Sequence, residues 1–168
     1  ISDSHLAYAD ERDDERKIEL ATRRGKLFRT PEATLRAQRQ YAIENNLPIV
    51  HTGDMIDFVS EANLDKAKDI FGQGRWIVAA GNHEYSLYVG EAKEDDAYRA
   101  QSYDKVQAVY PNDLTFYSKV VNGVNFVALD NGYYKFSKEQ FAKMKAEVKR
   151  GLPIIMLCHN PLYTPELC

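Results

Sequence analysis

The chain has 168 residues, about the size of one domain and enough to bury a hydrophobic core. Its 44% hydrophobic and 28% charged residues are typical of a globular protein, and no apolar run is long enough to span a membrane. The net charge of -3 argues against a protein that coats nucleic acid, but it excludes no small phosphorylated substrate.

Both ends of the sequence favour an incomplete copy of a single domain over residues 1–168. The chain opens on ISDSH without an initiator Met and stops at TPELC. We therefore expect a strand to be missing before Asp3 and further elements after Cys168. A signal peptide could have preceded Ile1, so the compartment stays open, with a cytoplasmic location as the working assumption. The oligomeric state also stays open.

The first quarter of the chain is dominated by charge. Residues 8–30 carry charges of both signs and only a thin apolar stripe, so we expect a helix or helical loop over the surface. Two interpretations are open: a solvated face, or a lid over a site. Thr30 and Pro31 then predict a helix over residues 31–46, with Thr as N-cap and Pro at the first position.

The middle of the chain alternates strands and helices. Residues 47–54 (LPIVHTGD) and 75–82 (RWIVAAGN) are short apolar runs that close near glycine, which is typical of buried strands. Ser60 is expected to begin a helix over residues 60–72. A second helix is predicted from residue 93 to the stop signal at Pro111.

The last third predicts a hairpin, a helix and a strand. Residues 114–130 are two strands around Asn122-Gly123, the strongest hairpin signal in the chain. Ser137 and Gln140 form a capping box for a helix over 141–150, and 153–161 is a final strand in which Cys158 is expected to be a buried small hydrophobe. The alternation predicts an α/β domain with a mixed sheet.

All four histidines lie at the C-terminal end of a predicted strand, and three have another metal-ligand type close by. The carboxyl ends of strands in an open α/β sheet share one edge, so such residues can converge. Asp, His and Asn suit Mn, Fe, Zn or Ni, with Mn favoured, and a bridging carboxylate would describe a two-metal centre for phosphoryl transfer. The residues are His5, His51, His83 and His159, with Asp3, Asp54 and Asn82 beside three of them.

Four blocks in order resemble the calcineurin-like metallophosphoesterases. They are Asp3-Ser-His5, GDMID (53–57), GNHE (81–84) and Cys-His159 after an apolar strand. The resemblance implies an αββα sandwich of two mixed β-sheets flanked by helices. It also implies hydrolysis of a phosphomonoester or phosphodiester, in a small molecule or nucleotide, by a hydroxide that bridges two divalent metal ions.

Carried over to this chain, the resemblance implies a role for each residue of the blocks. Asp3 and His5 would bind the first metal, Asp54 would bridge both ions, and Asn82 and His159 would bind the second. His83 would face the substrate phosphate, as a proton donor or a stabiliser of developing charge.

The chain departs from the family pattern in three places. No histidine follows His159, whereas the family's last block, Gly-His-x-His, supplies one more histidine to each metal. Asp57 stands where purple acid phosphatases have a tyrosine ligand, so no purple iron centre is expected. The gap from Asp3 to Asp54 is long, and residues 10–29 are the extra material. We expect either an incomplete site or a fragment of a longer protein.

Other residues near the blocks have two interpretations each. His51 either supports the site or packs ordinarily. Asp57 and Glu84 are expected to orient ligands or cap a turn rather than touch metal, and Asp130-Asn131 is interpreted as a turn. Gly53 and Gly81 are expected to allow sharp turns. Five tyrosines are candidates for substrate packing: Tyr85, Tyr88, Tyr133, Tyr134 and Tyr163.

Two functional hypotheses follow. The first is a metal-dependent phosphoesterase, and the second is a non-catalytic metal-binding fragment or pseudo-enzyme of the same fold that acts as a binding module. A generic nucleotide-binding domain is not supported, because the sequence has neither GxxxxGK[ST] nor GxGxxG.

Overall fold

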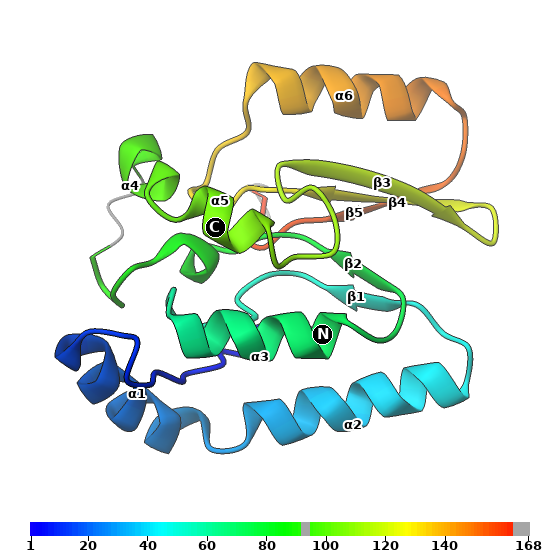
Figure 1. Cartoon of the computed structure of the whole chain (residues 1–168). Coiled ribbons are helices and arrows are strands. Elements are labelled where there is room, and N and C mark those ends of the chain that lie inside the picture. Colours follow the sequence, from blue (N-terminus) through cyan, green and yellow to red (C-terminus); the bar gives the residue numbers. More distant parts are fainter. Residues whose placement is uncertain (92–94, 163–168) are drawn as a thin grey trace.

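A computed structural model of the chain describes residues 1–91 and 95–162 (Figure 1). Four layers are stacked in it: a helix, two small β-sheets and a second layer of helices. This is the α/β arrangement of two sheets between helices that the resemblance implied. Tyr163, Cys168 and the first residues of the helix predicted from residue 93 lie outside the described residues.

The two-stranded sheet pairs β1 (Ile49–His51) with β2 (Trp76–Val78) in parallel. Both strands are shorter than their apolar runs, because the chain leaves the sheet directly after each strand and enters a loop. Helices α2 (Pro31–Glu44) and α3 (Glu61–Phe71) cover the outer face of this sheet (Figure 1). The main hydrophobic core fills that interface, with Leu35, Ile70 and Val78 almost fully buried.

The three-stranded sheet is mixed. Strand β3 (Phe116–Val121) pairs antiparallel with β4 (Val124–Leu129), and β4 pairs in parallel with β5 (Ile154–Leu157). A two-residue turn joins β3 to β4, and both Asn122 (φ 50°) and Gly123 (φ 81°) are left-handed, as the hairpin prediction requires. Helix α6 (Lys138–Lys149) lies across its outer face, and its predicted capping box is formed by Ser137 and Gln140 (Figure 1).

A second core joins the two sheets. Ile77 and Ala79 from the β2 segment pack against Ala128 of β4 and Leu157 of β5, all of them buried. Cys158, the next residue, is only half-buried, so the expectation of a buried cysteine was wrong. Because the sheets are fixed face to face, the loops that follow β1, β2, β4 and β5 are held at one end of the sandwich.

Two helix predictions need correction. Thr30 makes no side-chain capping hydrogen bond, although the helix begins at Pro31 as predicted. The predicted helix over 93–111 is two short helices, α4 (Asp96–Ala100) and α5 (Tyr103–Gln107). The helix breaks because Ser102 turns inward, where it is buried and its hydroxyl donates to the Tyr85 carbonyl (2.9 Å). None of the helices in the described residues is long and apolar enough to cross a membrane.

The charged segment folds as α1 (Glu15–Phe28), inside the predicted range of residues 8–30. Asp14 caps it through a hydrogen bond from the Lys17 backbone N–H (3.0 Å). Most of the helix is exposed, and Leu20 is its only buried residue. Leu20 packs with Ala7 and Phe58, so one stripe of α1 is held against the body of the domain.

Candidate metal centre

Three loops and the N-terminal segment bring six predicted residues to one place. We call Asp3, His5, Asp54, Asn82, His83 and His159 the candidate centre. The N-terminal segment lies beside residues 53–56, because Asp3 N donates to Gly53 O (3.0 Å) and His5 N to Asp54 O (2.9 Å). His5 therefore follows no strand in the described residues, contrary to expectation, and only an isolated bridge, Leu6 to Ile56, continues the pairing.

Asp54 is the hub of this cluster. Its carboxylate lies 3.7 Å from His5 Nε2 and 3.3 Å from His159 Nε2, and it accepts a hydrogen bond from the backbone N–H of His83 (3.0 Å). Two groups of potential ligands form around it, each with its ligand atoms within 4.8 Å of one another. Asp54 belongs to both groups, which are His5–Asp54–His83 and Asp3–Asp54–His159.

This grouping differs from the division that the resemblance implies. His83 lies with His5, although the resemblance keeps it off the metals, and Asp3 lies with His159 rather than with His5. His5 Nε2 is nevertheless 3.8 Å from Asp3 Oδ1, so Asp3 lies near both groups. The assignment of ligands to individual ions therefore stays a prediction.

The three histidines of the centre are oriented in the same way. Each Nδ1 is held from outside the cluster: His5 by the Asp57 carboxylate (2.9 Å), His83 by the Asp57 carbonyl (2.7 Å) and His159 by the Thr52 carbonyl (3.0 Å). These oxygens accept, so Nδ1 donates and the lone pair of a neutral imidazole lies on Nε2. Such outer contacts fix the tautomer of metal-binding histidines.

Asp57 is a buried anion that serves two of these histidines. Arg24 binds it in a bidentate pair, Nε to Oδ2 at 2.6 Å and Nη2 to Oδ1 at 2.7 Å. Burial alone would raise the pKa of Asp57, but the bonds from Arg24, His5 and His83 hold that pKa far below its usual range. Asp57 thus contacts two candidate ligands from outside the cluster, and its role in orienting them stays a prediction.

Helix α1 contacts the candidate centre directly. Arg24 reaches Asp57, and the Phe28 ring stacks on His5 with centroids 4.6 Å apart and planes within 5°. Leu20, Arg24 and Phe28 are spaced by four residues, so they form one stripe along the helix. The charged segment is therefore more than a solvated face. Sequence reasoning missed Arg24 and Phe28, although the four-residue spacing was a usable signal.

Glu84 connects the loop of Asp54 to the loop of Gly81 through buried hydrogen bonds. It is fully buried and accepts backbone hydrogen bonds from Asp54 (2.8 Å), Met55 (2.7 Å) and Gly81 (2.6 Å), and one from the Tyr110 hydroxyl (2.9 Å). Burial, followed by the charge of Asp54, raises the pKa of Glu84. The carboxylate positions the loops and does not belong to either ligand group.

Close backbone packing explains the glycines. A Cβ on Gly81 would lie 2.1 Å from Asp54 Oδ1, and one on Gly53, which has φ of 107°, would lie 2.6 Å from Gly81 N. Gly132 closes the other side, where a Cβ would meet Gly81 O at 2.7 Å. The loops after β1, β2 and β4 contact one another at these glycines, which leaves no room for a side chain. Gly132 was not predicted.

His51 supports the Gly53 turn. The Gly53 N–H donates to His51 Nδ1 (3.2 Å), so Nε2 carries the proton and donates to Ser4 Oγ (2.9 Å). Burial is the main reason that its pKa falls to about 3, which keeps the ring neutral. His51 lies in neither ligand group and holds the loop that carries Asp54.

The Asp130-Asn131 segment does more than form a turn. Asn131 Oδ1 accepts from the backbone N–H groups of His159 (2.9 Å) and Asn160 (3.0 Å), and Asn160 Nδ2 donates back to Asn131 O (2.8 Å). Asp130 pairs with Arg99 (2.5 Å). Asn131 thereby fixes the loop that carries His159, which the turn signal in the sequence did not reveal.

The donor set fits a divalent cation. The half-buried Asn82 side-chain amide forms no hydrogen bond within the described residues, so its oxygen is free to bind. The hydrogen bond to Asp54 raises the pKa of His159 to about 9. Burial opposes the protonation of His83, but the bonds to Asp57 and the charge of Asp54 still raise its pKa. The carboxylates thus stabilise the protonated histidines, and the same negative charge would favour a bound metal cation.

The backbone at the centre is unusual. Asp3 (φ 53°), His5 (φ 50°) and Asp54 (φ 57°) are all left-handed, a conformation that residues other than glycine rarely adopt. Such strain gathers at functional sites, where the surrounding structure holds it in place. Here the paired backbones of residues 3–6 and 53–56 do so.

The comparisons agree with the geometry. The family model of the calcineurin-like phosphoesterases matches residues 1–168. No curated protein matches the chain. The match over the whole chain, together with two carboxylate–histidine groups that share Asp54, shows that the chain belongs to the calcineurin-like phosphoesterase family.

Proposed function

We propose that this protein is a metal-dependent phosphoesterase that hydrolyses a phosphomonoester or phosphodiester in a small molecule or nucleotide. The observation that carries the proposal is the position of Asp54 in both ligand groups. A carboxylate shared by two groups is what a dinuclear centre requires. Membership of a family of phosphoesterases supports the same activity.

We assign Asp3 and His5 to one ion, Asn82 and His159 to the other, and Asp54 to both. When bound, two divalent ions supply the activated water and the positive charge that phosphoryl transfer needs. Manganese is our first choice, because carboxylate, amide and imidazole donors without thiolate suit it. Asp57, Glu84 and His51 would position the metal ligands and their loops and would not contact the substrate.

We assign His83 to the substrate phosphate. Its Nδ1 is held by Asp57, which leaves Nε2 to donate a proton to the leaving oxygen or to stabilise developing charge. The position of His83 beside His5, with ring centroids 4.7 Å apart, supports a role at the edge of the centre. The raised pKa of His83 favours the protonated form that donation needs.

The test is hydrolysis by the Mn2+-loaded chain of p-nitrophenyl phosphate and of bis(p-nitrophenyl) phosphate. Asp54→Asn should abolish turnover of whichever ester is cleaved, because both ions lose a charged ligand. The exposed Asp104→Asn is the matched control and should leave the rate unchanged. Full activity of Asp54→Asn would refute the proposal. Metal binding without turnover of either ester would favour the non-catalytic alternative.

A further inference from the structure

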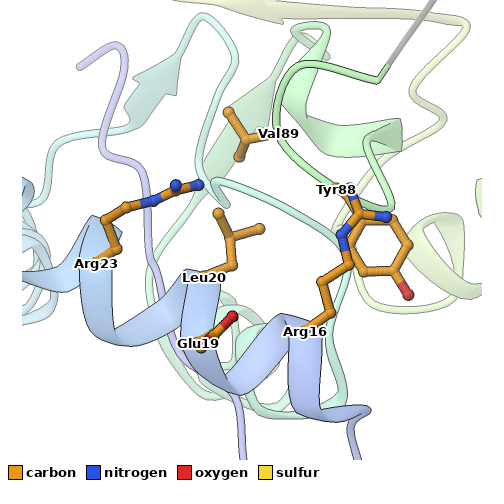
Figure 2. Close-up of a pocket in the computed structure, with 6 residues that line it drawn as sticks. All are labelled: Arg16, Glu19, Leu20, Arg23, Tyr88 and Val89. Carbon is orange, nitrogen blue, oxygen red and sulfur yellow. The ribbon is translucent and has the colours of Figure 1, made fainter.

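A pocket of about 500 Å³ lies between α1 and the loop after His83 (Figure 2). This volume is in the range of small-molecule sites, about 300–1,000 Å³. Four of the lining residues come from α1 and two from the loop. They are Arg16, Glu19, Leu20, Arg23, Tyr88 and Val89.

Both walls of this pocket continue from elements that hold the candidate centre. Leu20 lies one helical turn before Arg24, whose guanidinium binds Asp57. On the other wall, Tyr88 follows His83 by five residues, and His83 is also bound to Asp57. The pocket thus lies between two elements that also contact Asp57, and a substrate that extends from His83 along α1 would place its remaining part in this pocket.

The pocket combines cations with an apolar floor. Leu20 is buried and Val89 half-buried, and they pack in the same cluster. The Arg16 guanidinium lies over the Tyr88 ring, 4.1 Å from its centroid, and pairs with Glu91. Tyr88 in turn donates its hydroxyl to Asp14 (2.7 Å). These contacts leave an aromatic and aliphatic surface that an organic group can cover.

Arg23 is the cation that remains available. It forms no ion pair or hydrogen bond with any of the described residues, and Figure 2 shows its side chain extending from α1 towards the space between Leu20 and Val89. Glu19 is the one acid among the lining residues, and within the described part of the chain no ion pair joins it to Arg16 or Arg23. A planar guanidinium without a partner is suited to bidentate binding of a carboxylate or phosphate.

We propose that this pocket binds the leaving group of the substrate and that this leaving group carries a second anionic group, which Arg23 recognises. The inference rests on the proposed phosphoesterase function and narrows its substrate class to phosphate esters with a second carboxylate or phosphate. Among the four candidate tyrosines that the structure describes, Tyr88 is then the one that lines this pocket. Tyr85 and Tyr133 are buried, and Tyr134 is exposed.

The kinetic test compares three esters: phenyl phosphate, 4-carboxyphenyl phosphate and 1,4-phenylene bisphosphate. Arg23→Gln should raise KM about tenfold for at least one of the two esters with a second anion, leave kcat unchanged and change KM for phenyl phosphate less than twofold. Which of the two responds distinguishes a carboxylate from a phosphate. Lys26→Gln, an exposed cation of α1 outside this pocket, is the matched control.

A binding test separates this inference from the proposed function. The metal-free chain is titrated calorimetrically with 1,4-benzenedicarboxylate and with phenylphosphonate. At least one should bind, and Arg23→Gln should weaken that binding about tenfold, whereas Lys26→Gln should not. Equal binding by all three proteins, or equal KM changes for all three esters, would overturn the inference even if phenyl phosphate is hydrolysed. Arg23-dependent binding without hydrolysis would uphold the pocket and count against the catalytic proposal.

Discussion

Replacing Arg24 by Ala tests whether α1 is part of the candidate centre. Arg24 makes two charged hydrogen bonds, at 2.6 and 2.7 Å, to a carboxylate whose residue is fully buried. Removing one partner of a buried ion pair costs about 3–5 kcal/mol, because the other charge is left without compensation. Asp57 keeps its bonds to His5 and His83, and the Arg24 side chain is 21% exposed, so we expect the lower end, about 3 kcal/mol.

Arg12→Ala is the matched control for this substitution. Arg12 also pairs with carboxylates, Asp10 and Asp65, but its side chain is 48% exposed. Exposed ion pairs contribute only about 0–1 kcal/mol. The assay is urea unfolding followed by circular dichroism, with Arg24→Lys as a second variant that keeps the charge but loses the bidentate geometry.

The two arginines should differ clearly. We expect Arg24→Ala to lose about 3 kcal/mol and Arg24→Lys an intermediate amount, whereas Arg12→Ala should leave the urea midpoint nearly unchanged. A loss below about 0.5 kcal/mol for Arg24→Ala would refute the reasoning that Asp57 is a buried anion neutralised from α1.

Three further substitutions test the supports of the centre. Gly81→Ala should weaken Mn2+ binding at least tenfold in calorimetry, because the new Cβ would lie 2.1 Å from Asp54 Oδ1. Gly25→Ala is the control inside α1: its Cβ would have its nearest neighbour, the Ala7 carbonyl oxygen, 3.8 Å away, so it should stabilise the fold by about 0.5–1 kcal/mol. Glu84→Gln should cost about 2–3 kcal/mol in urea unfolding, because an amide nitrogen would face N–H or O–H donors; an unchanged midpoint would contradict this. His83→Ala should keep its metal and lose turnover, and loss of metal would contradict the role assigned to His83.

Local signals predicted the parts of the fold that depend on few residues. The Ser137–Gln140 capping box and the Asn122-Gly123 turn form as expected, because neighbouring residues alone satisfy their hydrogen bonds and dihedral angles. Ser60 likewise caps α3 through the Asn63 N–H. The convergence of Asp54, His83 and His159 was predicted because loops at the ends of neighbouring strands share one edge.

Contacts between distant segments were not predictable in this way. The docking of Arg24 on Asp57 joins residues 33 positions apart, and nothing near either one indicates the partner. The same applies to Asn131, whose hold on the His159 loop spans 28 positions. The break at Ser102 also has a tertiary cause, since its hydroxyl bonds to Tyr85 O. In each case tertiary packing overrides a local pattern.

The most direct test of the account is the number of metal ions that Asp54 holds. The 168-residue chain and its Asp54→Ala variant would be titrated with Mn2+ and, after desalting, measured by elemental mass spectrometry. We predict close to two ions per chain in the wild type and loss of both in the variant, because both ligand groups contain Asp54. A variant that keeps one of two ions, or a wild-type chain that binds none, would contradict the shared centre.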